Sequence, residues 1–372
     1  MKDPRIQTLA HNLIHFSCKL QQGENILIER YGQDCDPLVE ALIREAYAAG
    51  GNPFVWLREP KIQRALAMGA TESQLDRMAE TDCALMRGMQ AYIGIRGYTN
   101  SAESKDVPLE QIAKMDALYS NPLHSKIRVP HTKWCVLRYP TPAMAQAADS
   151  STEGFEDYYF NVCCLDYSKM SRAMEPLVAL MERTDKVRLT GPGTDLTFSI
   201  AGLPAIPCAG EANIPDGEVF TAPVRGSING TLHYNTPALF EGFTYENITL
   251  TYRDGILADA TANDTERIRK VFARDDGCKE VGEFAIGVNP YITRPMKDTL
   301  FDEKIMGSFH FTPGQCYDDC DNGNQSQIHW DLVCIQTPEY GGGEMWFDGV
   351  LVRKDGRFVL PELACLNPEN LK

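Results

Sequence analysis

Hydrophobic and polar positions form segments of two kinds along the first half of the chain. Short apolar runs predict strands at residues 25–28, 54–57, 91–95 and 134–139, the first of them buried. Amphipathic stretches lie between them and predict helices, one of them over residues 36–49, where Pro37 suits the first turn and Gly50 the end. Strands separated by helices are typical of βαβ units, so we expect a mostly parallel sheet.

The pattern changes near residue 186. A long helical stretch over about residues 152–182 comes first, and many short strands separated by turn residues come after it. One further helix is expected at residues 264–273, with Asn263 as its cap. We therefore predict an α/β domain with a mostly parallel sheet over residues 1–190, followed by a strand-rich α+β domain over residues 191–372.

The composition and net charge of the chain limit the kinds of partner that we expect it to bind. The chain has 372 residues, with 51 acidic and 36 basic side chains and a formal net charge of −15. This negative field repels phosphate backbones and anionic lipid surfaces, so we expect neither nucleic acid nor a membrane as a partner. Twelve cysteines without a CxxC motif, together with the absence of an apolar N-terminal segment, predict reduced thiols in a cytoplasmic protein.

Two familiar motifs are incomplete. Residues 191–196 (GPGTDL) carry two of the three glycines of a dinucleotide-binding loop, but they join a strand to a strand rather than a strand to a helix. His11 and His15 have the spacing of the zinc ligands in HExxH, but Asn12 stands where the catalytic Glu would be. We interpret the two histidines as a core or surface pair.

The last third of the chain concentrates carboxylates and histidines. His329 and Asp331 stand two apart in a β-like run, so alternation places both on one face of a strand. His310 follows a similar segment and supplies a second imidazole. Glu218 and Glu283 lie within apolar strand segments, where an unpaired carboxylate is costly. Such a set is rich enough in ligands for two divalent ions.

Three blocks in this region, at residues 213–223, 281–311 and 326–333, closely resemble conserved blocks of the M29 family. This family comprises thermophilic-type aminopeptidases, which are two-metal exopeptidases. The resemblance implies two divalent ions per chain (zinc, cobalt or manganese) and implies Tyr317 and Glu283 as catalytic residues. It implies as metal ligands Glu218, Glu283, Glu303, His310, His329 and Asp331.

The leading hypothesis is a metal-dependent aminopeptidase that removes N-terminal residues from short peptides by means of a metal-activated water. The resemblance also implies a homodimer, with the first domain serving assembly and access to the active site. A two-metal amidohydrolase or deaminase acting on a small non-peptide amide stays open as an alternative. A metal-binding protein without turnover is disfavoured, because the ligand set and Tyr317 are complete.

Overall fold

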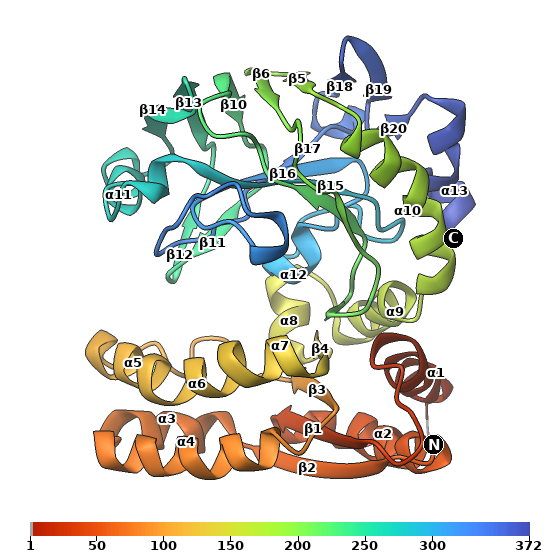
Figure 1. Cartoon of the computed structure of the whole chain (residues 1–372), viewed down its shortest axis with the longest axis vertical. Helices are drawn as coiled ribbons and strands as arrows, with labels where there is room; N and C mark the ends of the chain where they lie inside the picture. Colours follow the sequence, from red (N-terminus) through yellow and green to blue (C-terminus); the bar gives the residue numbers. More distant parts are fainter. Residues whose placement is uncertain (1–2) are drawn as a thin grey trace. The chain divides into compact units, whose positions relative to one another are not determined.

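The computed structural model describes residues 3–372, which form two compact units (Figure 1). The first unit holds residues 3–164 and the short segment Gly210–Ile214. The second unit holds Leu165–Ala209 and Pro215–Lys372. Among the helices described, none combines the length and apolar character needed to cross a membrane.

The first unit is built on a five-stranded sheet in the order β2-β1-β3-β4-β8, in which every neighbouring pair is parallel. This confirms the mostly parallel sheet expected from the apolar runs. Because β8 comes from the segment Gly210–Ile214, the chain returns to this sheet after entering the second unit. The strands are β1 (Asn25–Tyr31), β2 (Asn52–Arg58), β3 (Ala91–Arg96), β4 (Lys133–Arg138) and β8 (Asn213–Ile214).

Helices connect these strands. The predicted helix after residue 35 is α2, which has a proline in its first turn and is followed by Gly50 with φ of 78°. On one face of the sheet, strand residues such as Leu27 and Tyr92 pack with helical residues such as Met86. The helices are α1 (Pro4–Asn12), α2 (Asp36–Ala48), α3 (Pro60–Gly69), α4 (Glu72–Met86), α5 (Leu109–Met115), α6 (Asn121–Leu123), α7 (Val129–His131), α8 (Pro142–Ala147) and α9 (Thr152–Cys163), with π-helical turns at Leu13–Ser17, Asp116–Ser120 and His124–Arg128.

The helical stretch predicted over residues 152–182 is helical in the structure but is divided into two helices. The first, α9, ends at Cys163, and α10 (Tyr167–Glu182) begins after Asp166. The Asp166 carboxylate accepts a hydrogen bond from the backbone N–H of Lys169 at 3.0 Å, and this N-cap starts a new helix. The break coincides with the passage from the first unit to the second.

The second unit contains two antiparallel sheets and a small hairpin, as the strand-rich pattern predicts. The larger sheet has the order β14-β13-β10-β6-β5-β18-β19-β20 and the smaller the order β17-β16-β15-β9-β7. Strands β15 and β16 run through the middle of this unit in Figure 1, and every residue of both is buried.

The bounds of these strands follow in chain order. They are β5 (Lys186–Gly191), β6 (Thr194–Ser199), β7 (Ile206–Cys208), β9 (Glu218–Thr221), β10 (Asn229–His233), β11 (Ala238–Phe240), β12 (Phe243–Tyr245), β13 (Thr249–Arg253), β14 (Ile256–Thr261), β15 (Val281–Gly287), β16 (Ser308–Pro313), β17 (Val333–Ile335), β18 (Glu344–Phe347), β19 (Val350–Lys354) and β20 (Arg357–Phe358).

Three short helices complete the second unit: α11 (Thr265–Val271), α12 (Thr299–Asp302) and α13 (Pro368–Leu371). The predicted cap of α11 is wrong by one residue. Asp264, not Asn263, accepts the hydrogen bond from the Arg267 N–H, at 3.0 Å. Both side chains are competent N-caps, so residue type alone does not distinguish them.

Candidate metal centre

Three of the predicted metal ligands lie on neighbouring strands of the smaller sheet. Glu218 begins β9, Glu283 lies in β15 and His310 in β16, and these strands are adjacent in the order β9-β15-β16. The residue opposite Glu283 is Thr312, which shares a face of β16 with His310 because side chains alternate along a strand. The three predicted side chains are almost completely buried, with exposed fractions of 5%, 2% and 1%.

The prediction that His329 and Asp331 lie on a regular strand is wrong. Strand β17 begins only at Val333, and His329 makes an isolated bridge with Gly314. This approach needs glycine, because Gly314 has φ of +108° and a Cβ there would lie 2.0 Å from the Ile328 carbonyl oxygen. The extended segment still points His329 and Asp331 toward the same carboxylate.

The side chains form two triads that share Glu283. In the first, His310 Nε2 lies 3.3 Å from Glu283 Oε1 and 3.6 Å from Glu218 Oε2. In the second, His329 Nε2 lies 3.1 Å from both Glu283 Oε2 and Asp331 Oδ1. Within each triad the candidate ligand atoms are all within 4.8 Å of one another. The two oxygens of Glu283 therefore face different triads.

Glu303 joins this cluster through Lys304. The Lys304 ammonium lies 2.6 Å from one oxygen of Glu303 and 2.6 Å from Glu218 Oε1, while Asp216 lies 3.7 Å away. The lysine is 1% exposed. Sequence reasoning missed it, although it was the only base between the acidic residues 302 and 331 and stood next to a predicted ligand.

A hydroxyl group supports the second triad. Thr312 Oγ1 donates a hydrogen bond to Asp331 Oδ1 at 2.9 Å. Sequence reasoning missed Thr312 as well, although strand alternation from His310 was a usable signal. With this hydroxyl and Lys304, each triad has one carboxylate held by a neighbouring donor. Such outer contacts orient the groups that bind a metal.

The buried charges shift one another's pKa values. Burial alone would lower the pKa of His310, but the carboxylates of Glu218 and Glu283 outweigh it and raise the pKa to about 10. Burial raises the pKa of both Glu218 and Glu303, although Lys304 opposes the shift. Without a further cation, the cluster compensates its negative charge by holding protons.

The donor set fits divalent cations. Four carboxylates (Glu218, Glu283, Glu303 and Asp331) lie together with one ammonium group and two imidazoles, and such a set is costly to bury unless protons or metal cations neutralise it. Two buried atoms that face the cluster, Glu218 Oε2 and His329 Nε2, have no hydrogen-bond partner. Mixed carboxylate and imidazole ligands suit zinc, cobalt and manganese.

Tyr317 lies beside the second triad. Its ring centroid is 4.7 Å from that of His329 and 5.4 Å from that of Phe220. Burial of part of the ring and the nearby carboxylates of Glu283 and Asp331 raise the pKa of Tyr317 well above its ordinary value. The raised pKa keeps the hydroxyl protonated, and the residue, which is 46% exposed, borders open space.

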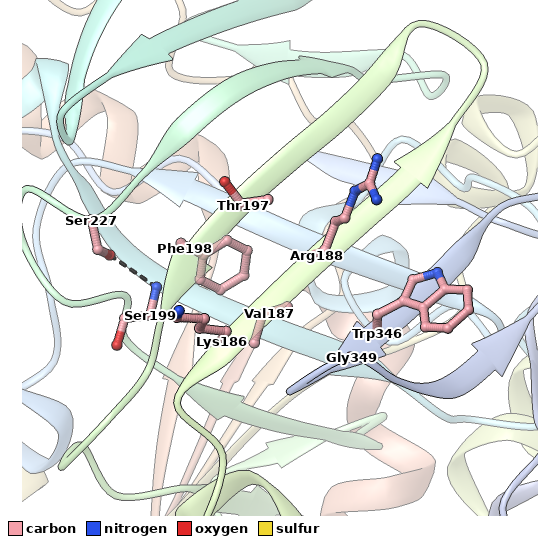
Figure 2. A pocket seen from close by; sticks show the side chains of 9 residues that line it. All are labelled: Lys186, Val187, Arg188, Thr197, Phe198, Ser199, Ser227, Trp346 and Gly349. Atoms are coloured by element: carbon pink, nitrogen blue, oxygen red, sulfur yellow. Dashed lines mark hydrogen bonds between the residues drawn. The ribbon is translucent and has the colours of Figure 1, made fainter.

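A surface pocket of about 590 Å³ lies elsewhere in the second unit. It is formed on β5, β6 and β18, where Arg188 lies between Thr197 and Trp346 on adjacent strands (Figure 2). Arg188 is paired with Asp195 at 2.9 Å, and none of the lining residues belongs to the two triads. The pocket therefore adds nothing to the metal-binding chemistry.

Comparison with known proteins agrees with a metal-dependent hydrolase. A model of the thermophilic metalloprotease (M29) family matches residues 2–358, and the chain belongs to this family. Aminopeptidase T of Thermus aquaticus is 25% identical over 409 residues, which cover 95% of this chain and 96% of that protein. Aminopeptidase PepS of Streptococcus thermophilus is 24% identical over 404 residues, covering 93% and 94%. The protein is thus a hydrolase of the aminopeptidase type.

Solved structures share the fold. Wild-type AmpT from Thermus thermophilus superposes with a TM-score of 0.79 at 22% identity, covering 96% of this chain and 99% of that one. The 2,5-dihydroxypyridine dioxygenase of Pseudomonas putida KT2440 also superposes, with a TM-score of 0.63 at 12% identity and coverage of 96% and 98%. Because proteins named for different reactions share this fold, the reaction has to be argued from the site.

Proposed function

We propose that this protein is an aminopeptidase that binds two divalent metal ions and removes N-terminal residues from short peptides. The observation that carries the proposal is the position of Glu283, whose two oxygens face two different triads. A carboxylate in that position suits a bridge between two ions. We assign Glu218 and His310 to one ion and His329 and Asp331 to the other, with Glu303 as a further ligand.

Divalent ions bound there supply Lewis-acid polarisation of the scissile carbonyl and lower the pKa of a bound water. The chain's own residues perform the rest. Tyr317, whose raised pKa keeps it protonated, donates a hydrogen bond to the oxygen of the scissile carbonyl as negative charge develops there. Glu283, at the centre of the cluster, is the catalytic carboxylate that would hold both ions and so fix the position at which the attacking water is activated.

The acidic surroundings favour a substrate with a free N-terminal ammonium. Glu303 is held by Lys304 through one oxygen, which leaves its other oxygen available for an ammonium or a metal ion. Such an interaction places the first peptide bond of the substrate, rather than an internal one, at the reacting position. Peptides with a blocked N-terminus lack this interaction and should be poor substrates.

We also propose a homodimer and a reducing compartment such as the cytoplasm. Strand β2 is at the edge of its sheet, and large apolar side chains on β2 and the following α3 are exposed: Phe54 by 40%, Leu57 by 61% and Ile62 by 59%. Such an edge with apolar neighbours suits burial against a second copy. All twelve cysteines are free thiols, which fits a reducing environment.

A substrate panel tests the proposal. Unblocked di- to tetrapeptides, the same peptides with an acetylated N-terminus, and small non-peptide amides are incubated with the protein loaded with zinc, cobalt or manganese. We expect stepwise release of N-terminal residues from the unblocked peptides only. Hydrolysis of the small amides without hydrolysis of peptides would instead identify an amidohydrolase.

A further inference from the structure

A second cluster of metal-binding side chains lies in the first unit. His11 is in α1, and His15 is in the π-helical turn that follows it, so both lie on one side of the same helical segment. Glu45 in α2 meets both of them. The spacing of the two histidines does not by itself indicate a third ligand. The packing of α2 against α1 supplies one, Glu45, which is 30 residues from His15 in the chain.

The three side chains converge on one oxygen atom. Glu45 Oε1 lies 2.8 Å from His11 Nδ1 and 3.1 Å from His15 Nε2, and the two imidazole rings are 4.4 Å apart. The other carboxylate oxygen accepts a hydrogen bond from Gln7 Nε2 at 2.7 Å. Gln7 therefore fixes the carboxylate in the orientation in which Oε1 faces both histidines.

The two distances from Glu45 Oε1 to the histidine nitrogens match those between adjacent ligand atoms around a metal ion. With bonds of about 2.1 Å, adjacent ligands are about 3.0 Å apart in octahedral and about 3.4 Å apart in tetrahedral geometry. We propose that His11, His15 and Glu45 bind one divalent transition-metal ion, with water in the remaining positions. Two imidazoles and one carboxylate favour Zn²⁺, Ni²⁺, Co²⁺ or Cu²⁺ over Mg²⁺ and Ca²⁺.

The exposure of the cluster supports binding from solution. The His11 and His15 side chains are 60% and 39% exposed, whereas Glu45 is 16% exposed and therefore well positioned by its neighbours. Partial burial would raise the pKa of Glu45, but the hydrogen bonds from His11 and His15 keep it below its ordinary value. The bound ion fastens α1, at the start of the described chain, to α2.

Zinc stoichiometry tests this site in the full-length protein. The wild type is dialysed against micromolar free Zn²⁺, and bound zinc per chain is measured by mass spectrometry. Two variants remove ligands, His15→Ala and Glu45→Gln, and a control variant, His131→Ala, removes another exposed histidine of the same unit. We expect each ligand variant to bind one zinc ion fewer than the wild type and the control.

Thermal unfolding and activity complete the test. Zn²⁺ added after the catalytic centre is saturated should raise the unfolding midpoint of the wild type and of His131→Ala, but not that of Glu45→Gln, because only a ligand bound to the folded state stabilises it. Peptidase activity of all variants should match the wild type. If all four proteins bind the same amount of zinc and have the same unfolding midpoints, the three residues bind no metal, and the two histidines are only hydrogen-bonded to Glu45.

Discussion

His329 Nδ1 donates a hydrogen bond to the backbone carbonyl oxygen of Gln315 across 2.7 Å. A carbonyl oxygen only accepts, so Nδ1 carries a proton, and the other ring nitrogen, Nε2, is the one that can bind a cation. That nitrogen faces Glu283 and Asp331, each at 3.1 Å. Burial alone would lower the pKa of His329, but these two carboxylates outweigh it and raise the pKa well above its ordinary value. Between two carboxylates, this nitrogen holds a proton when no metal is bound and offers its lone pair to a metal ion that takes the place of that proton.

The close approach at Gly314 creates this arrangement, so we expect Gly314→Ala to damage the metal centre. A Cβ at this position would meet the Ile328 carbonyl and displace the segment that carries His329. The free energy of unfolding should fall by more than about 2 kcal/mol, and zinc affinity should fall with it. Gly202→Ala is the matched control, because Gly202 also has a positive φ, of +79°, but no neighbour within 4 Å. Equal effects of the two variants on zinc affinity would contradict this account.

Tyr317→Phe separates catalysis from metal binding. The ring contacts with Phe220 and His329 persist in the variant, and only the hydroxyl is lost. If the hydroxyl stabilises the developing oxyanion, kcat should fall by roughly 10²–10³-fold. KM and zinc content should stay near the wild-type values, because neither depends on that hydrogen bond. An unchanged kcat would identify Tyr317 as a residue that only lines the site.

Lys304 should contribute most to the free energy of unfolding when no metal is bound. Its ammonium is 1% exposed and contacts Glu218 and Glu303, so Lys304→Met leaves two buried carboxylates without their cation. We expect the metal-free protein to lose about 3–5 kcal/mol of unfolding free energy in urea titrations. The loss should be smaller in the metal-loaded protein, because bound cations then neutralise the same carboxylates.

Lys354→Met is the control for that comparison. Lys354 pairs with Glu344 at 3.1 Å and is 53% exposed, and exposed pairs contribute only about 0–1 kcal/mol. An equally small loss in Lys304→Met would show that the buried lysine does not balance the acidic cluster.

Metal binding should release protons. In the metal-free protein the raised pKa of His310, about 10, keeps its imidazole charged near neutral pH, whereas a metal ligand has to be neutral. Zinc therefore displaces that proton, and its apparent affinity should rise as the pH increases from about 6 to 8. Calorimetry in two buffers of different ionisation enthalpy measures the number of protons released. An affinity independent of pH, with no proton released, would contradict the charged state assigned to His310.

Local patterns predicted part of this structure well. Apolar runs located β1 and β3, and the structure buries all the interior residues of these strands. The helix break at Asp166 was missed, because an amphipathic pattern continues across it and only the cap interrupts the hydrogen bonding.

In the cluster around Glu283 and in the cluster on α1 and α2, the contacts that depend on long-range packing could not be predicted from the sequence. Lys304 contacts Glu218, which is 86 positions away in sequence, and no local pattern brings these residues together. The same holds for Glu45, which reaches His11 and His15 only because α2 packs on α1. The pattern of carboxylates and histidines pointed to most of the predicted ligands and the resemblance to a family implied the full set, whereas Lys304 and Thr312 could be placed beside them only in the folded chain.

The central claim is that Glu283 serves two metal ions at once, and zinc stoichiometry tests it most directly. The measurement uses the His15→Ala background, so that the cluster on α1 and α2 does not contribute. In this background we expect two zinc ions per chain. Adding either His310→Ala or Asp331→Ala should leave one zinc ion per chain. Adding Glu283→Ala should leave no tightly bound zinc. Two ions retained in the Glu283→Ala protein would contradict a shared ligand and with it the two-metal centre proposed for this peptidase.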